Sequence, residues 1–255
     1  MPTTNSNPIA IVTGGSRGLG RATVEALARR GVPSIFTYHT NKSAADEVVE
    51  SVQRSGVRAV ALQLDTGDTR AFPAFAEEIR RVLHKWGAEH FNYLVNMAGT
   101  SHEGLFGKVT EEDFDAAYRV HANGPFFLTQ TLLPLIADGG RIVNISSGLT
   151  RFAYPGRITY AAMKGAVEVM THYMAKELGA RRIAVNTVAP GAIQTDFSGG
   201  IVRDNPDVAH HIAETTALGR PGLPDDIGPM IASLLSEDNR WVNAQRIEVS
   251  GGQAI

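Results

Sequence analysis

The segment Thr13-Gly14-Gly15-Ser16-Arg17-Gly18-Leu19-Gly20 directly follows a run of four apolar residues, Ile9 to Val12. Glycines at the first, fifth and seventh positions of the G-x-x-x-G-x-G pattern let the backbone turn sharply. They also leave free N–H groups at the start of a helix, where a pyrophosphate can approach. The spacing differs from the G-x-G-x-x-G dinucleotide fingerprint, so the turn alone leaves two interpretations open: a phosphate-binding turn or a glycine-rich turn without a ligand.

The same succession of a short apolar strand and an amphipathic helix continues along the chain. Apolar runs predict strands at 9–12, 35–38, 57–64, 91–96, 141–146, 183–188 and 246–249. Helical spacing predicts helices at 19–30, 43–55, 72–86, 110–136 and 159–178, with another beginning near Pro224. Ser43 with Asp46 and Thr110 with Asp113 have the spacing of helix-capping pairs.

This alternation predicts the fold class. We expect an α/β protein with one doubly wound, Rossmann-type domain, in which about seven parallel strands carry helices on both faces. Residues 1–8 are expected to form a flexible tail and residues 9–255 the domain, with a looser substrate lid around 192–222. Ligands of such sheets bind beyond the carboxyl ends of the strands.

Composition excludes several classes of protein. The 255 residues are 43% hydrophobic and 20% charged, as in globular proteins, and the net charge is −2. This balance predicts neither a nucleic-acid partner nor an anionic membrane surface. The chain has no cysteine, no secretory signal at its start and no apolar run near the ~20 residues of a bilayer span. We therefore expect a cytoplasmic protein.

Three side chains are candidates for chemistry. Tyr160 and Lys164 are four residues apart and share one helix face, so we expect the ammonium to lower the pKa of the phenol below ~10. Ser147 follows the fifth strand and can donate a hydrogen bond to a substrate oxygen. Taken singly, each has an ordinary alternative: a solvated Tyr–Lys pair on a helix and a turn serine.

The combination is more specific than its parts, because each motif falls at a strand's carboxyl end or on the helix that follows. These motifs are the 13–20 turn, Asn96-Met97-Ala98-Gly99, Ser147, Tyr160 with Lys164, and Pro190-Gly191. The chain resembles the short-chain dehydrogenase/reductase family from about Pro8 to Gly252.

The resemblance implies an oxidoreductase that interconverts a ketone and a secondary alcohol by hydride transfer with a nicotinamide cofactor. Tyr160 would donate or accept the proton, and Ser147 would orient the carbonyl. Lys164 would hold the nicotinamide ribose and lower the pKa of Tyr160. A 3-oxoacyl compound or a small ketone is the substrate that the resemblance implies, and a homotetramer is the assembly.

The resemblance also implies a set of cofactor-binding residues. They are Gly14, Ser16, Arg17, Gly18, Leu19 and Gly20 in the turn, Tyr38, His39 and Thr40 after the second strand, Asp65 and Thr66, Asn96, Ala98 and Gly99, Tyr160 and Lys164, and Pro190, Gly191, Ile193 and Thr195. The segment 36–42 contains no carboxylate to bind a ribose 2′-OH, and a guanidinium at position 17 suits a 2′-phosphate. We therefore predict NADP(H) as the cofactor.

The sequence departs from the family pattern on the long fourth helix. His121 stands where the family has an asparagine that completes a catalytic tetrad. Two alternatives remain open: the imidazole relays protons, since it titrates near ~6.5, or it fills space and bonds a backbone carbonyl. Asn123 could serve instead if Gly124-Pro125 permits a local slip. Met97 also replaces an asparagine of the family, and Asn243-Ala244-Gln245 predicts altered subunit contacts.

Other features carry weaker predictions. The eight histidines lack ligand spacing, so we predict no metal, and His210-His211 is interpreted as a solvated lid surface. Phe152, Tyr154 and Phe197 are candidates for the wall of a substrate pocket, and Met163 and Met170 are interpreted as packing residues. Alternative functions are a non-catalytic dinucleotide-binding sensor, an NAD-dependent alcohol or sugar dehydrogenase of the same family, and a methyltransferase.

Overall fold

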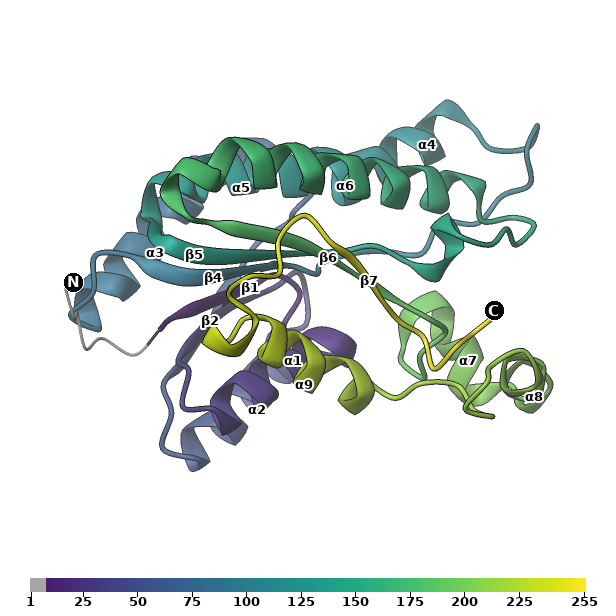
Figure 1. The fold of residues 1–255 in the computed structure, drawn as a ribbon, viewed down its shortest axis with the longest axis horizontal. Coiled ribbons are helices and arrows are strands. Elements are labelled where there is room, and N and C mark those ends of the chain that lie inside the picture. The colour runs from purple at the N-terminus through teal and green to yellow at the C-terminus, as the bar shows by residue number, and fades with distance from the viewer. Residues whose placement is uncertain (1–7) are drawn as a thin grey trace.

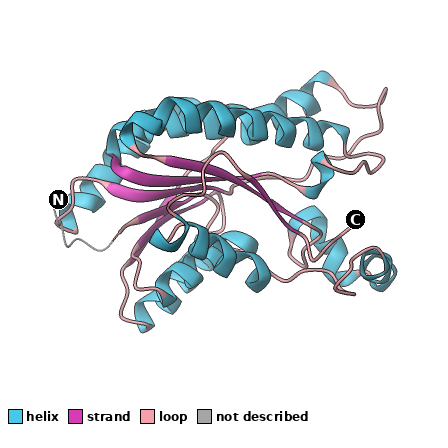
Figure 2. Ribbon diagram, in the orientation of Figure 1, coloured by secondary structure: helices cyan, strands magenta, loops and turns pink. Residues whose placement is uncertain are grey.

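A computed structural model describes residues 8–255 and shows a seven-stranded sheet between two layers of helices (Figures 1 and 2). The strands are β1 (Ala10–Val12), β2 (Ser34–Tyr38), β3 (Ala59–Gln63), β4 (Phe91–Asn96), β5 (Ile136–Ile145), β6 (Ala184–Pro190) and β7 (Arg246–Val249). Their order is β3-β2-β1-β4-β5-β6-β7, and every neighbouring pair is parallel. The winding reverses between β1 and β4, so the predicted fold class is confirmed.

Helices cover both faces of the sheet (Figure 1). One layer holds α1 (Gly18–Arg29), α2 (Lys42–Arg54) and α9 (Pro224–Leu234), and the other holds α3 (Phe72–Lys85), α4 (Glu111–Tyr118), α5 (Gly124–Leu132) and α6 (Ile158–Glu177). Two short helices, α7 (Ile201–Asp204) and α8 (Pro206–Glu214), lie near the C-terminal end of the chain. The expected looser stretch between β6 and α9 is therefore partly helical.

The central strand shows why the sheet is buried on both sides. Ala10 and Val12 belong to one hydrophobic core and Ile11 to the other, and all three are fully buried. Side chains of successive strand residues point to opposite faces, so an unbroken apolar run serves both helix layers. The strands predicted at 91–96 and 246–249 have the observed bounds.

Two helix predictions were wrong in detail. The helix expected over 110–136 begins as predicted, with Thr110 Oγ1 accepting from Asp113 N at 3.1 Å, but a π-helical turn over Arg119–Asn123 interrupts it. Gly124 after this turn lies so close to the Thr66 carbonyl that an added Cβ would be 2.2 Å from that oxygen. The second helix is capped by Asn41 Oδ1, which accepts from Ala44 N at 3.0 Å, rather than by Ser43.

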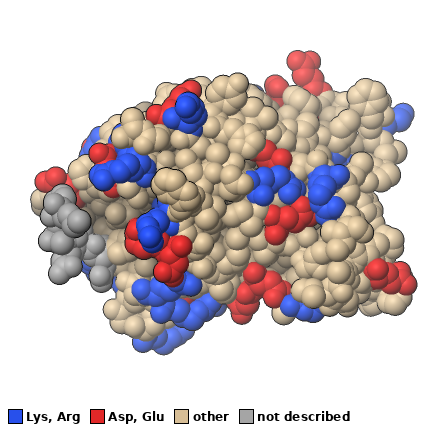
Figure 3. Space-filling model, viewed as in Figure 1, with Lys and Arg blue, Asp and Glu red and all other residues tan. Residues whose placement is uncertain are grey.

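The surface carries charges of both signs. Figure 3 shows positive and negative side chains next to one another in several small groups, and most of this face carries neither. No helix within residues 8–255 is long and apolar enough to span a bilayer. The predicted tail at 1–8 lies outside the described residues, except for Pro8.

Candidate active site

The three predicted catalytic side chains meet at the carboxyl end of β5. Ser147 follows β5 and begins a short 3₁₀ turn, and its Oγ accepts from Leu149 N at 3.2 Å. Tyr160 lies in the first turn of α6, and Lys164 Nζ lies 5.4 Å from the centroid of its ring. Lys164 Nζ donates to the carbonyl of Ile145, the last residue of β5, at 2.8 Å. The packing of α6 against β5 therefore brings together the residues that the sequence separates.

The protonation of this pair corrects the sequence-based expectation. Burial raises the pKa of Tyr160 well above its ordinary value, and the charge of Arg157 and the Ser147 side chain offset this only in part. Burial also lowers the pKa of Lys164 to about 8. Burial disfavours the charged form of each group, which raises the pKa of the phenol and lowers the pKa of the amine. The prediction that Lys164 lowers the pKa of Tyr160 is therefore wrong for this structure, and the phenol is protonated at neutral pH.

His121 lies in the π turn and contacts Tyr160, the predicted proton donor. Its ring meets the Tyr160 ring edge-on, with centroids 5.1 Å apart, and only 1% of the residue is exposed. Nε2 lies 2.8 Å from the Thr100 carbonyl oxygen, to which an N–H at that position donates. Nδ1 is buried and has no partner among the described residues. The backbone hydrogen bond is the one that the packing alternative predicted, while the catalytic assignment of His121 stays a prediction.

Burial fixes the charge state of this imidazole. It lowers the pKa of His121 to about 2, and the nearby charge of Lys164 adds to the effect. The ring is therefore uncharged over the whole working range of pH. The π turn ends directly before Gly124-Pro125, and it is the His121 ring that lies against Tyr160.

The glycine-rich turn packs so closely that only glycine fits at two positions. A Cβ on Gly20 would lie 2.0 Å from the Gly14 carbonyl oxygen, and one on Gly14 would lie 3.0 Å from Ala98 Cα. Thr13 Oγ1 accepts from the backbone N–H groups of Met97 and Ala98, both at 2.9 Å. The turn and the 96–99 motif are thus one structural unit.

The start of α1 suits a phosphate. Its N-cap residue, Arg17, makes no side-chain cap hydrogen bond, and its first turn contains no acidic residue. Helix N–H groups without a side-chain acceptor, next to an exposed guanidinium, form an anion-binding end. The Gly18 Cα faces Thr195, since a Cβ there would lie 3.5 Å from Thr195 Cγ2. The residues present therefore fit the pyrophosphate of a dinucleotide.

The remaining predicted cofactor residues lie along the same edge of the sheet. Tyr38 ends β2, followed by exposed His39 and Thr40, and His39 Nε2 lies 3.7 Å from an Asp65 carboxylate oxygen. Asp65 Oδ1 also accepts from Gly67 N at 2.8 Å. Thr66 is buried.

Asn96 supports the central strands from within the sheet. Its Nδ2 donates to Asn144 Oδ1 at 2.8 Å and to Thr129 Oγ1 at 3.0 Å. Pro190 ends β6, and the segment after it pairs through Ile193 with Gly222. Ser16, Leu19, Gly99 and Gly191 are all at least partly accessible. The cofactor roles of these residues stay predictions.

Aromatic side chains stand around the catalytic tyrosine. The Phe197 ring lies 5.8 Å from the Tyr160 ring, and Tyr154 Oη lies 2.6 Å from His211 Nε2 on α8. His211, predicted to be solvated, is exposed but also ties α8 to the loop after β5. Phe152 lies against Gly148 and under the Arg151 guanidinium instead. Met163 is buried and Met170 packs against its cluster, as predicted.

Comparison with known proteins identifies the family. Residues 14–254 match the family model described as Enoyl-(Acyl carrier protein) reductase. Versicolorin reductase 1 of Aspergillus parasiticus is 34% identical over 257 residues, covering 96% of this chain and 95% of that protein. The chain belongs to the short-chain dehydrogenase/reductase family.

Two solved structures of the family superpose closely on this chain. The promiscuous reductase LugOII, which catalyses keto-reduction at C1 during lugdunomycin biosynthesis, has a TM-score of 0.93 and 37% identity, with 98% of this chain and 99% of that chain covered. The angucycline C-6 ketoreductase LanV with bound NADP has a TM-score of 0.91 and 38% identity, covering 97% and 95%. The family resemblance of the sequence motifs is thereby confirmed.

This short-chain dehydrogenase/reductase also has a charged group that sequence reasoning missed. It holds residues 146–157 between β5 and α6, the loop that carries Ser147, which we call the serine loop. Glu168 Oε1 accepts from Ser146 Oγ at 2.6 Å, from Thr150 Oγ1 at 2.7 Å and from Arg246 Nε at 2.7 Å. Arg246 also donates to the Ser147 carbonyl at 3.3 Å. Glu168 could have been found from the sequence, because it lies one helical turn after Lys164 on α6. Nothing in the local sequence marks Arg246.

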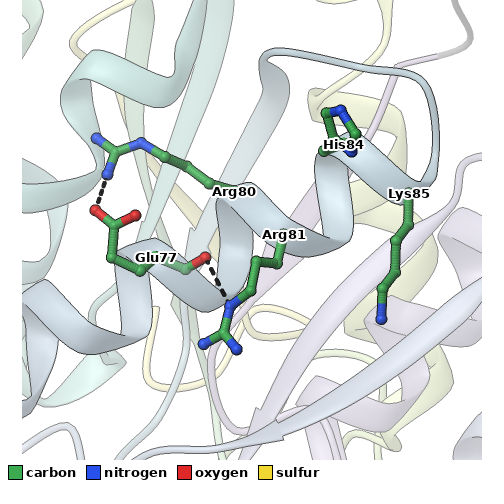
Figure 4. Close-up of a pocket in the computed structure, with 5 residues that line it drawn as sticks. All are labelled: Glu77, Arg80, Arg81, His84 and Lys85. Atoms are coloured by element: carbon green, nitrogen blue, oxygen red, sulfur yellow. Dashed lines mark hydrogen bonds and ion pairs between the residues drawn. The ribbon is translucent and has the colours of Figure 1, made fainter.

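A basic hollow lies apart from these residues. Figure 4 shows it on α3, lined by Glu77, Arg80, Arg81, His84 and Lys85. Its side chains extend from one exposed helix face, and Glu77 pairs with Arg80. Within residues 8–255, no group of three or more histidine, aspartate or glutamate side chains is placed to hold a metal ion.

Proposed function

We propose that the chain is an NADP(H)-dependent ketone reductase in which Tyr160 is the proton donor. The observation that carries the proposal is the meeting of the half-buried Tyr160 with Ser147 and Lys164 at the carboxyl end of β5, where burial raises the pKa of the phenol. A phenol that keeps its proton at neutral pH is a donor in the direction from ketone to alcohol.

Each residue has one task in this reaction. NADPH, when bound, supplies the hydride to the carbonyl carbon. The Ser147 hydroxyl donates a hydrogen bond that orients the carbonyl oxygen, and Tyr160 gives its proton to that oxygen to complete the alcohol. The charged amine of Lys164 lies near the phenol ring and stabilises the phenolate that remains.

The choice of NADP(H) is supported by charge at the adenosine end. Arg17 is exposed beside the phosphate-binding start of α1, and the end of β2 presents His39 and Thr40 in place of an acid. A guanidinium binds phosphate oxygens well, whereas a carboxylate there would repel a 2′-phosphate. The family relative LanV has bound NADP in its structure.

The aromatic surroundings favour a ketone on a flat ring system. Phe197 faces Tyr160, and Tyr154 lies between the serine loop and α8. Rings of this kind stack on planar, conjugated substrates. The names of LugOII and LanV, both keto-reductases, support this class over the 3-oxoacyl compounds that the sequence first suggested.

A ketone screen with NADPH tests the proposal. Loss of NADPH absorbance is followed with fused-ring aromatic ketones, aliphatic ketones and a 3-oxoacyl thioester analogue. Tyr160→Phe should lower kcat/KM by about 10²- to 10⁴-fold and leave the Kd of NADPH unchanged. Tyr173→Phe, on an exposed face of the same helix, is the matched control. NADPH binding without turnover of any ketone would instead support the dinucleotide-sensor alternative.

We also propose association into a homotetramer. Large apolar side chains remain exposed on two neighbouring helices, with Phe114 and Tyr118 on α4 and Phe126 and Phe127 on α5. An apolar area of this kind favours contact with a second copy. Light scattering tests it, and a monomer at micromolar concentration would contradict it.

A further inference from the structure

The last six residues, Ser250–Ile255, form a segment that we call the C-terminal strap. In Figure 1 this yellow segment runs from β7 towards α7 and α8. Gly251 and Gly252 have positive φ angles of 65° and 77°, so the chain turns back on itself directly after β7. The strap therefore reaches loops that border the catalytic residues.

The backbone of the strap pairs with the far end of the predicted lid. Gln253 forms an antiparallel bridge with Thr216, which follows α8. Ala217 N and Leu218 N donate to the carbonyls of Gly252 and Gly251 at 3.2 and 3.0 Å, and Ala254 N donates to Thr215 O at 2.7 Å. These bonds fix the point where the lid returns to the domain.

The Gln253 side chain holds the near end of the lid. Its Oε1 accepts from Ala192 N at 2.8 Å, and only 6% of the residue is exposed. Gly191 lies so close that an added Cβ would be 2.8 Å from the same oxygen. Gln253 thus fixes the backbone directly after β6, where the resemblance places Ile193 and Thr195 against the nicotinamide carboxamide.

The strap also contacts the serine loop. Arg151 Nη1 donates to Ala254 O at 2.7 Å, and its other terminal nitrogen donates to Gln253 O. The same guanidinium pairs with Glu248 on β7 at 2.8 Å. One residue of the strap, Gln253, therefore contacts both ends of the lid and the loop that carries Ser147.

We infer that Gln253 is a positioning residue, which sets the loop after β6 for the nicotinamide end of the cofactor and ties it to the lid and to the serine loop. Only the part of the inference that concerns cofactor binding rests on the proposed NADP(H) function. A buried amide oxygen that accepts a backbone N–H restricts the conformations of the loop before a ligand binds. Less conformational entropy is then lost on binding. Without this acceptor, the Ala192 N–H is left unsatisfied or the loop shifts.

Gln253→Met tests the inference, because it keeps the length of the side chain and removes the acceptor. Amide hydrogen exchange is measured on the protein without NADPH, and the Kd of NADPH is measured by fluorescence. We expect exchange of peptides covering 190–196 and 215–218 to accelerate about five- to tenfold. The Kd of NADPH should rise by a similar factor, while kcat at saturating NADPH changes less.

Two variants separate the acceptor from general damage. Gln253→Glu keeps an acceptor oxygen and should restore slow exchange at 190–196. Gln53→Met makes the same change at an exposed glutamine on α2, and it should match the wild type. If Gln253→Met is too unstable to study, Gln253→Asn withdraws the acceptor with a smaller change.

Specific results would overturn the inference. Wild-type exchange at 190–196 in both Gln253→Met and Gln253→Asn would do so, as would equal acceleration in Gln53→Met. A wild-type protein that does not bind NADPH would contradict the proposed function, whereas the exchange measurement would still decide the role of Gln253.

Discussion

The Tyr160 ring meets the His121 ring edge-on, with the ring centroids 5.1 Å apart and the planes at 84°. The resemblance places this imidazole where the family has an asparagine, and burial lowers its pKa so far that it stays uncharged. It can therefore hold the tyrosine in position and accept a hydrogen bond at Nδ1, but it does not take up a proton in the working range of pH.

His121→Asn should consequently leave the shape of the pH–rate profile unchanged between about pH 5 and 8. The absolute rate should fall moderately, because the smaller side chain no longer packs against the Tyr160 ring. Steady-state kcat/KM across this range is the measurement. A limb near pH 6.5 in the wild type that is missing in the variant would show that the imidazole titrates during catalysis.

The same side chain should make the fold sensitive to acid. The pKa of His121 is about 2 in the folded protein and ~6.5 in the unfolded chain, so the unfolded state binds more protons between these values. The stabilising contribution is complete above ~6.5 and is lost as the pH falls towards 2. Urea unfolding at fixed protein concentration should show the wild type losing about 1 kcal/mol more per pH unit than His121→Asn below pH 6. Parallel losses in both proteins would contradict this.

Lys164 should set the alkaline limit of activity. Burial lowers the pKa of its amine to about 8, so its charge is lost as the pH rises through this value, whereas Tyr160 titrates far above it. We expect kcat/KM for ketone reduction to fall above about pH 8. Lys164→Arg keeps the charge and should remove this limb, although its geometry lowers the rate. A limb that persists in Lys164→Arg would assign it to another group.

Arg17 should determine the choice between NADPH and NADH. Arg17→Ala removes an exposed guanidinium beside the start of α1, so kcat/KM for NADPH should fall about 10- to 100-fold while that for NADH stays nearly constant. Arg21→Ala, on the next turn and paired with Glu25 at 2.9 Å, is the matched control. Equal losses with both cofactors, or a wild type that prefers NADH, would contradict the assignment.

Much of the fold could be predicted because the sheet is buried on both sides. Unbroken apolar runs such as Ile9 to Val12 have few alternatives to a central parallel strand, and Thr110 marks a helix start through its own side chain. Periodicity gave no signal for the π turn at Arg119–Asn123, and none for the close approach of Gly124, which follows it, to the Thr66 carbonyl from another part of the chain.

The candidate site also has some features that could be predicted from the sequence and others that could not. Ser147, Tyr160 and Lys164 could be found because their spacing and their positions after strands are local properties of the sequence. The pKa of Tyr160 could not, because burial sets it, and the His121 and Phe197 rings that lie against the phenol come from other parts of the chain. Gln253 and Arg246 could not either, since their partners lie 61 and 78 residues away along the chain.

Gly99 and His121 share one small volume, because a Cβ at position 99 would lie 2.8 Å from His121 Cε1. An alanine at position 99 is therefore compatible only with a smaller or displaced group at 121. Substitutions at the two positions are coupled, and neither is expected to drift alone during evolution. A designer who transplants this centre into another scaffold must move the two positions together.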